Sequence, residues 1–320
     1  MENPLVSVIV PVYNAAEYLE RCLSSIAEQT FAPIEVIIIN DGSVDSSASI
    51  IENYLKRYLW FHCITQTNKG PGESRNAGID FSHGKYLAFI DSDDYVTPDF
   101  IDTLFKLAEK NSADIVICNF YIQLQNGIHF IYPFFTHANI MSGDEAAQKT
   151  MDMFALPGFI WNKLYRRELF INNNIKFPSI YYEDTVTICK LMINSRAVVT
   201  TKKPCYCYCR NKQSITSTLN FNFRHANDYL AAASIMRDYL IKQNLWDEWE
   251  KTYKEFLRRI EAHIFLEIEL KRDTYDSHTR KVEIRSVHSQ IRKLMMEPAS
   301  DEDTLTVSQH PPRKSEEEKS

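Results

Sequence analysis

Apolar runs and amphipathic segments alternate along the first hundred residues, and this alternation constrains the fold more than any other feature of the sequence. The run Val6–Val12 is rich in β-branched residues, which is typical of a strand buried on both faces. The segment Ala16–Gln29 places Leu19, Leu23 and Ile26 at helical spacing. Apolar strands that alternate with helices indicate a parallel sheet covered on both faces. The further predicted strands are Glu35–Ile39, His62–Gln66 and Lys85–Ile90, and the further helices are Asp45–Tyr58 and Pro71–Phe81.

Beyond residue 97 the predicted elements are more varied. Asn126-Gly127 is a hairpin dipeptide, and Ser142-Gly143-Asp144-Glu145 is typical of a helix start. From Phe223 to about Met296 the pattern is almost wholly helical, whereas residues 298–320 are polar, charged and proline-bearing, which is typical of a disordered tail. Before this helical region, from residue 98 onward, we expect three helices and four strands. The helices are Pro98–Lys110, Trp161–Asn172 and Glu183–Ser195, and the strands are Asp114–Gln123, Ile128–Phe135, Ala197–Thr201 and Pro204–Cys209.

Composition restricts the class of protein. The formal net charge of −6 argues against a general nucleic-acid binder, because such proteins carry a basic domain. No apolar run approaches the ~20 residues of a membrane span, and Met1-Glu2-Asn3-Pro4 does not begin a signal peptide. The seven cysteines lie mostly in apolar segments, which is typical of reduced thiols in a cytoplasmic protein. Cys205, Cys207 and Cys209 share one strand face and are expected to act as small buried hydrophobes, the alternative being a metal or redox site.

An acidic cluster, Asp91-Ser92-Asp93-Asp94, follows the apolar run Tyr86–Ile90. Carboxylates at the end of a buried strand must be paired or must hold a cation. Asp91 and Asp93 point the same way in an extended backbone. They can then bind Mg²⁺ or Mn²⁺, and such ions take further ligands from substrate phosphates. The alternative is a polar turn in which Asp94 or Thr97 caps the following helix.

Two further polar segments follow predicted strands, namely Pro11-Val12-Tyr13-Asn14 and Asn40-Asp41-Gly42-Ser43. Ligands of open parallel sheets bind outside the carboxyl ends of the strands, so we expect these segments and the acidic cluster to line one crevice. Asp41 can accept a hydrogen bond from the imide N–H of a pyrimidine, and Gly42 allows a positive φ. The alternative is that Asp41 or Ser43 caps the next helix. The sequence contains neither the dinucleotide fingerprint after the first strand nor a P-loop.

A glycine-rich segment, Asn68-Lys69-Gly70-Pro71-Gly72-Glu73-Ser74-Arg75-Asn76-Ala77-Gly78, runs into a predicted helix. Its backbone N–H groups and the Arg75 guanidinium suit a diphosphate. The alternative for Arg75 is a surface ion pair with an acidic neighbour.

The order of these motifs resembles that of family 2 glycosyltransferases, the inverting nucleotide-sugar enzymes with the GT-A fold. Trp161-Asn162-Lys163-Leu164-Tyr165 and Tyr182-Glu183-Asp184 resemble acceptor-side motifs of bacterial surface-polysaccharide members, so the likeness extends to about residue 220. It implies an α/β fold with a Rossmann-like, mostly parallel sheet flanked by helices and an α-helical C-terminal region. The motifs that carry it in the first hundred residues are Val8-Ile9-Val10-Pro11-Val12-Tyr13-Asn14, Asn40-Asp41-Gly42-Ser43-Val44-Asp45, Asn68–Gly78 and Phe89-Ile90-Asp91-Ser92-Asp93-Asp94.

The resemblance implies a role for each motif. Asp41 would bind the uracil of a UDP-sugar, and Asp91 would face the ribose and the sugar. Asp93 would ligate the Mn²⁺ or Mg²⁺ that bridges the diphosphate. Asp184 would be the general base and Glu183 would orient the acceptor, although on the residues alone this pair equally suits a helix N-terminus. The expected donor-binding residues are Pro11, Val12, Tyr13, Asn14, Asp41, Gly42, Asn68, Gly70, Arg75, Asp91, Ser92, Arg210 and Lys212, and the expected acceptor-binding residues are Trp161, Lys163 and Glu183.

Two basic segments each have two interpretations. Arg210 and Lys212 suit a lid that closes over the donor diphosphate, as a comparable segment does in family members, or else a plain solvated turn. Residues 278–296 form a basic amphipathic helix, which can lie on an anionic membrane or can pack its apolar stripe on the protein. Its basic residues are Arg280, Lys281, Arg285, Arg292 and Lys293, and its stripe is Ile284, Val287, Ile291 and Leu294.

We expect a nucleotide-sugar-binding subdomain at 1–97, an acceptor-binding subdomain of the same GT-A domain at 98–222 and a helical region at 223–297. The expected function is sugar transfer from a UDP-sugar to a hydroxyl of a glycan or polyprenyl-linked acceptor. We expect no nucleic-acid partner and a cytoplasmic location. Peripheral contact with the inner face of the plasma membrane and formation of a homodimer are both left open. The alternatives are a non-catalytic nucleotide-sugar-binding partner and a nucleotidyltransferase. The latter would carry a glycine-rich basic loop where this chain has Tyr13-Asn14-Ala15-Ala16.

Overall fold

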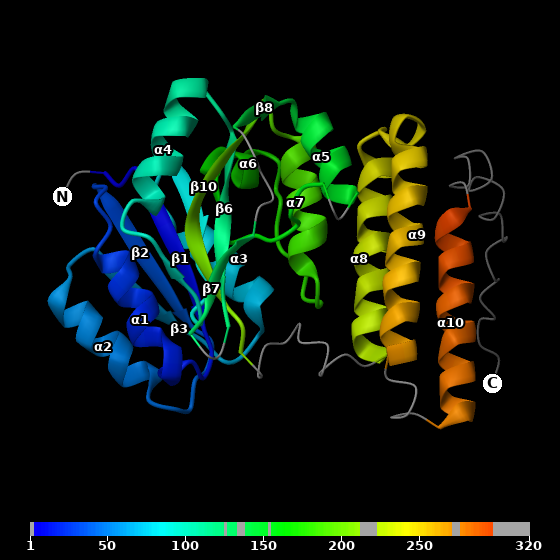
Figure 1. Cartoon of the computed structure of the whole chain (residues 1–320), viewed down its shortest axis with the longest axis horizontal. Coiled ribbons are helices and arrows are strands. Elements are labelled where there is room, and N and C mark those ends of the chain that lie inside the picture. The colour runs from blue at the N-terminus through cyan, green and yellow to red at the C-terminus, as the bar shows by residue number, and fades with distance from the viewer. Residues whose placement is uncertain are drawn as a thin grey trace, which may run out of the picture.

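The computed structural model describes residues 3–124, 127–132, 138–152, 155–211, 223–270 and 276–296. Helices flank a central sheet, and three C-terminal helices form a layer beside it (Figure 1). The strands are β1 (Val6–Val12), β2 (Ile34–Asn40), β3 (Phe61–Thr65), β4 (Tyr86–Phe89), β5 (Tyr95–Val96), β6 (Ile115–Gln123), β7 (His129–Tyr132), β8 (Asn139–Met141), β9 (Lys163–Arg166) and β10 (Val198–Cys209). The helices are α1 (Ala16–Ala27), α2 (Ser47–Arg57), α3 (Pro71–Phe81), α4 (Phe100–Asn111), α5 (Gly143–Met151), α6 (Arg167–Asn172), α7 (Glu183–Ile193), α8 (Phe223–Lys242), α9 (Trp246–Leu270) and α10 (Ser277–Met295).

The sheet has the strand order β3-β2-β1-β4-β9-β6-β10-β5, with β7 paired to β6 and β8 to β10. Its first four strands are mutually parallel, as their continuous apolar runs predict, and β2 and β4 are buried along their whole length. The predicted α/β fold class is therefore confirmed. Because β1, β2 and β4 run in the same direction, the polar segments that follow them lie along one edge of the sheet.

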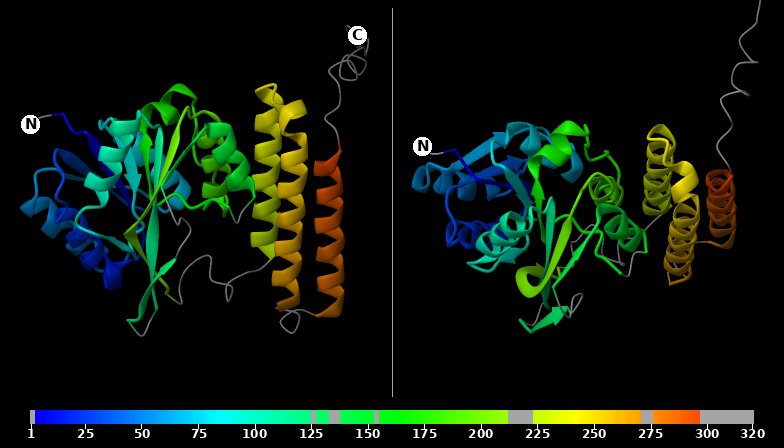
Figure 2. Two further views of the ribbon diagram at one scale, coloured as in Figure 1. Left: turned by 45° about the horizontal axis from the view of Figure 1, so that its top comes forward. Right: turned by 90° about the horizontal axis from the view of Figure 1, so that it is seen from above.

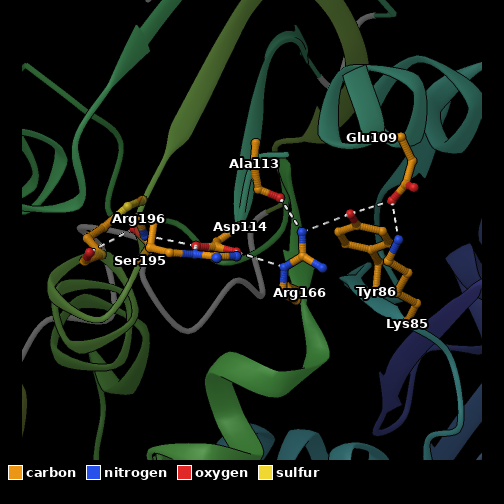
Figure 3. A network of polar contacts seen from close by, with 9 residues as sticks. Lys85, Tyr86, Glu109, Ala113, Asp114, Arg166, Ser195 and Arg196 are labelled. Atoms are coloured by element: carbon orange, nitrogen blue, oxygen red, sulfur yellow. Dashed lines mark hydrogen bonds and ion pairs between the residues drawn. The ribbon is translucent and has the colours of Figure 1, made fainter. Parts of the chain in front are cut away.

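Beyond β4 the sheet is mixed, and here one prediction is wrong. The expected helix Trp161–Asn172 begins instead as β9, which runs antiparallel between β4 and β6, and only its second half is helical as α6. Figure 3 shows what fixes β9: Arg166 donates from Nε to Asp114 Oδ1 (2.7 Å) and from Nη2 to the Tyr86 hydroxyl (3.3 Å). These partners are distant in sequence, so local periodicity contains no trace of them.

The other predicted elements differ from the structure mainly at their ends. β6 and β7 form the expected antiparallel pair, and the predicted strands Ala197–Thr201 and Pro204–Cys209 are one strand, β10, with irregular register between them. All seven cysteines are free, and those on β10 are buried as expected. Asn126 of the hairpin turn, Lys212 with the rest of the predicted lid, and the predicted tail at 298–320 lie outside the described residues.

The C-terminal helices α8, α9 and α10 lie side by side next to α5 and α7 (Figures 1 and 2). The predicted stripe of α10 packs on the protein, with Val287 and Ile291 buried, whereas Arg285 and Arg292 are exposed. The apolar face of α10 is thus already used inside the molecule, and contact with a membrane stays a prediction.

Among the helices that the structure describes, none has both the length and the apolar character needed to cross a membrane.

Candidate active site

The segments that follow β1 and β2 are joined to each other by hydrogen bonds. The Asn14 backbone N–H donates to Ser43 Oγ (3.1 Å), and the Val44 N–H donates to Asn14 Oδ1 (2.8 Å). The Ala16 N–H donates to Asp45 Oδ2 (3.0 Å), and it is Asp45, not Asp41 or Ser43, that accepts from the first turn of α2. The capping alternative for Asp41 and Ser43 is therefore wrong, and the two strand ends form one edge, as predicted.

Asp41 organises the glycine-rich loop. Asp41 is only 3% exposed. Its carboxylate accepts from Gln66 Nε2 (2.7 Å), the Lys69 N–H (2.9 Å) and the Gly70 N–H (2.8 Å). Gly42 beside it has φ +76°, and a Cβ there would lie 2.9 Å from the backbone nitrogen of Asn68. A carboxylate has about four acceptor positions, so Asp41 retains room for one further donor.

The other predicted donor-binding residues at this edge differ in how open they are. Tyr13 and Asn68 are exposed, and Pro11 and Gly70 are partly exposed. The Val12 side chain is fully buried in the sheet, so only its backbone can face a ligand. Their contact with a donor stays a prediction.

The acidic cluster forms a turn and not the expected extended segment, with the Asp94 N–H donating to the Asp91 carbonyl (3.0 Å). Asp94 does not cap α4, whose N-cap position is Asp99. It is buried and accepts from the Tyr206 hydroxyl (2.8 Å) and the Cys209 N–H (2.7 Å). Asp94 thus fixes β10 to the end of β4, while Ser92 is partly exposed in the turn.

Asp93 is held by two residues for which no role was predicted. Asn211 donates from Nδ2 to Asp93 Oδ2 (2.6 Å), and Arg21 of α1 donates from Nη2 to the Asp93 carbonyl (2.9 Å). Burial, and then the charge of Asp91, raise the pKa of Asp93 to about 6. Among the described residues no group of three or more His, Cys, Asp or Glu side chains is placed to hold a metal ion.

Arg75 connects the acidic cluster to the start of α7. The guanidinium is buried and donates from Nη2 to Asp91 Oδ1 (2.9 Å) and from Nη1 to Glu183 Oε1 (2.5 Å). Burial lowers the pKa of Arg75, but the charges of Asp91 and Glu183 outweigh burial and raise it. The alternative of a surface ion pair is therefore wrong. Both terminal nitrogens face carboxylates, so a direct contact of Arg75 with a diphosphate stays a prediction.

Asp184 lies next to this bridge in the first turn of α7. Burial, followed by the charge of Glu183, raises the pKa of Asp184 to about 7, although Arg75 acts in the opposite direction. The side chain remains partly open to solvent and accepts from the Thr185 N–H (2.8 Å). A carboxyl group with a pKa near 7 and access to solvent suits proton transfer at neutral pH. Glu183, in contrast, is buried against Arg75, and its contact with an acceptor stays a prediction.

Lys163 is fully buried, with 0% exposure, and its contact with an acceptor stays a prediction. Its ammonium donates to Asn162 Oδ1 (2.7 Å) and to the Phe159 carbonyl, and burial lowers its pKa to about 7. It therefore fixes the turn that enters β9. Trp161 is also mostly buried and stacks with Phe159 and Tyr208 (centroids 4.9 and 5.6 Å apart), so its acceptor contact stays a prediction.

The predicted lid is only partly described. The Arg210 side chain is exposed, and its backbone N–H donates to the Gln123 carbonyl (3.0 Å). Asn211 turns back onto the acidic cluster. Asn211 lies between the lid residues Arg210 and Lys212, and no role was predicted for it. Arg21 lies in helix α1, which carries no motif.

Comparisons with known proteins agree with this arrangement. The model of the family described as Glycosyl transferase family 2 matches residues 7–174. The putative glycosyltransferase EpsH of Bacillus subtilis (strain 168) is 33% identical over 261 residues, which cover 80% of this chain and 75% of EpsH.

Solved structures are similar in fold. Residues 1–349 of S. aureus TarS in complex with UDP-GlcNAc superimpose with a TM-score of 0.59 at 20% identity, over 91% of this chain and 90% of that one. The mannosyltransferase PcManGT from Pyrobaculum calidifontis, in complex with GDP-Man and Mn²⁺, gives 0.50 at 15% identity, over 92% and 88%. The chain belongs to glycosyl transferase family 2, and it is a glycosyltransferase with the GT-A fold.

Proposed function

We propose that this glycosyltransferase moves a sugar from a UDP-sugar to an acceptor hydroxyl with inversion at the anomeric carbon, and that Asp184 is the general base. The observation that carries the proposal is the Arg75 bridge. One buried guanidinium contacts Asp91 of the acidic cluster and Glu183, the neighbour of Asp184. The bridge therefore holds the start of α7 next to the strand ends where a donor would bind.

The uridine part of the donor would lie at the edge formed by β1 and β2. The remaining acceptor position of Asp41 suits the imide N–H of uracil, and Tyr13 offers an exposed ring beside it. The UDP and UDP-GlcNAc complexes of TarS, a neighbour in fold, support a uridine nucleotide. Uracil recognition by Asp41 would add to its bonds with Lys69 and Gly70 and would not replace them.

Asp93 would hold Mn²⁺ or Mg²⁺ together with the donor diphosphate. The residues fit a hard cation: burial and then the charge of Asp91 raise the pKa of Asp93, and the buried Oδ1 of Asn211 has no hydrogen-bond partner among the described residues. The cation would supply charge neutralisation for the departing diphosphate. A site with few protein ligands is typical of Mg²⁺ and related ions, which take others from phosphates and water.

Asp184 would take the proton in the transfer step. The acceptor oxygen forms a bond to the anomeric carbon while the bond from that carbon to the β-phosphate oxygen breaks, and its electron pair leaves with UDP. The acceptor proton passes to an Asp184 oxygen. Attack from the side opposite the diphosphate inverts the configuration. A positioned base contributes about 10²–10⁴-fold to such a step.

The acceptor would be a glycan or a polyprenyl-linked sugar. A lipid-linked acceptor would make peripheral contact of α10 with an anionic membrane useful, through exposed residues such as Arg285 and Arg292. The helical layer also offers a surface for a homodimer. Neither contact is needed for the chemistry at Asp184.

Thermal unfolding with Mn²⁺ and a panel of UDP-, GDP- and dTDP-sugars tests the donor and metal assignments, because a bound donor stabilises the fold by mass action. We expect a UDP-sugar to raise the Tm of the wild type and of Asp184→Asn, but not that of Asp93→Asn. Asp102→Asn, at a partly exposed position of α4 where the carboxylate pairs with Lys106, is the matched control and should behave as the wild type. Stabilisation by GDP-sugars alone would contradict the uridine assignment. UDP binding without turnover on any acceptor would support the non-catalytic alternative.

A further inference from the structure

The face that α8 turns toward the catalytic domain contacts the two residues immediately before α7. The Tyr181 ring stacks on His225 (centroids 4.6 Å apart, planes at 12°), and the Tyr181 N–H donates to Asp228 Oδ2 (3.2 Å). The Tyr182 ring stacks on Tyr229 (4.2 Å, 16°). Asp228 and Tyr229 follow His225 by three and four positions, so all three residues lie on one face of the helix. Figures 1 and 2 show α8 next to α7.

Tyr182 has a backbone conformation that residues with a Cβ rarely adopt. Its φ is +62° and its ψ 27°, in the left-handed region, and it occupies the N-cap position of α7 without a capping side-chain bond. Such a conformation persists only where the surroundings hold it in place. Here the Tyr182–Tyr229 stack is a contact that does so. The turn at Tyr182 sets the direction of the first turn of α7, and hence the position of the Asp184 carboxylate.

The Tyr229 ring is itself fixed from α9. It is 4% exposed and meets His263 edge to face (centroids 5.6 Å apart, planes at 85°). Glu267, one turn beyond His263, is buried in the same layer. Burial, and then the charge of Glu267, raise the pKa of Tyr182 to about 12, so the Tyr182 ring stays neutral at working pH. The Tyr229 ring is therefore packed between Tyr182 and helix α9.

We propose that the α8–α9 layer positions the general base, with Tyr229 acting as a positioning residue through Tyr182. This inference rests on the proposed role of Asp184. In this proposal Tyr229 acts through the turn at Tyr182 and not through a contact with substrate or the reacting atoms. It holds the turn at Tyr182, and that turn aims Asp184 at the acceptor hydroxyl. A misplacement of about 1 Å in such a group can lower the rate about 10²-fold.

Full-length Tyr229→Ala, Tyr229→Phe and Tyr253→Ala proteins test this. Phe retains the stacked ring. Tyr253 is a buried tyrosine of α9 that packs on Trp246 and donates from its hydroxyl to the Ala233 carbonyl of α8 (3.1 Å), so Tyr253→Ala controls for general loosening of the layer. Hydrogen exchange of peptides covering α7 is the first readout. The second is UDP release from UDP-GlcNAc with Mn²⁺ as a function of pH, with water in place of the acceptor.

In Tyr229→Ala we expect at least fivefold faster exchange in α7, at least tenfold lower kcat and a donor KM within twofold of wild type. The acid limb of the kcat profile should move to lower pH, because a looser Asp184 is better hydrated. Tyr229→Phe should match the wild type, and Tyr253→Ala should leave α7 exchange unchanged. Wild-type exchange in α7 of Tyr229→Ala, or equal losses in Tyr229→Ala and Tyr253→Ala, would overturn the inference. Normal turnover by Asp184→Asn would instead remove the proposed base and leave the exchange result standing.

Discussion

The donor edge and the base side of the site are built in different ways. At the donor edge, loops that follow neighbouring strands bind each other, as Asn14 does with Ser43 and Asp41 with Lys69, all within the first seventy residues. At the base side, Arg75 reaches Glu183 across 108 positions, and Tyr182 packs on the C-terminal helices. The comparison teaches that the proposed donor edge and the proposed base side depend on separate sets of contacts, which meet at Arg75.

The largest expected effect comes from removing the proposed base. Asp184→Asn should lower kcat for transfer about 10²–10⁴-fold, because an amide cannot accept the acceptor proton. Donor affinity, measured by calorimetry with a UDP-sugar, should stay within twofold, because the donor edge is unchanged. Loss of donor affinity together with turnover would show that the two sides are not separate.

Arg75→Met tests the point where the two sides meet. The change leaves the carboxylates of Asp91 and Glu183 without their common partner, and such a loss costs about 3–5 kcal/mol in buried ion pairs. Urea unfolding should show this fall in the free energy of unfolding.

Arg196→Met is the matched control for Arg75. The Arg196 side chain is 78% exposed, and its partner Asp114 keeps a second arginine, Arg166. Its loss should leave the free energy of unfolding close to that of the wild type, because an exposed ion pair contributes little. Equal effects of the two substitutions would mean that Arg75 is an ordinary surface pair.

Gly42→Ala should disturb the donor edge alone. Alanine is strained at φ +76°, and its Cβ would come too close to the backbone nitrogen of Asn68. We therefore expect a loss of about 1–3 kcal/mol in unfolding free energy and weaker UDP-sugar binding. Gly127 has a similar φ of +80°, and no atom of the described residues other than Gly127 and its chain neighbours lies within 4 Å of the place that a Cβ would take. Gly127→Ala should therefore cost only the backbone strain, about 1–2 kcal/mol, with donor affinity unchanged.

The smallest expected effect concerns α10. Each exposed arginine near an anionic surface contributes about 1 kcal/mol, so the double change Arg285→Glu and Arg292→Glu should release the protein from phosphatidylserine vesicles in a sedimentation assay. Kinetics in solution should not change. Failure of the wild-type protein to sediment with such vesicles at low salt would remove the membrane contact.

The donor edge could be predicted from the sequence because its contacts are local and its strands are apolar throughout. Pro71–Phe81 was predicted to be a helix and is α3, and Asp41 and Gly42 lie at the expected edge. Even there the roles of single carboxylates were hidden. A helix cap was the alternative considered for Asp94 or Thr97, yet Asp94 anchors Tyr206, 112 positions away.

The base side was harder to predict because its partners are distant in sequence. Nothing local marks Trp161–Asn172 as the start of an inserted antiparallel strand, or Lys163 as a fully buried ammonium. Asn211 and Arg21 hold Asp93, yet Asn211 had no predicted role in the lid segment and Arg21 belongs to no motif. Both are more than seventy positions from Asp93 in sequence, so local patterns do not reveal these contacts.

The pH dependence of transfer tests the assignment of Asp184 most directly. A base works in its deprotonated form, and the pKa of Asp184 is raised to about 7. Single-turnover transfer at saturating UDP-sugar and Mn²⁺ should therefore fall about tenfold per pH unit below pH 7 and level off above it. In Asp184→Asn the residual rate should lack this limb. A limb near pH 7 that persists unchanged in Asp184→Asn would contradict the assignment of Asp184 as the base.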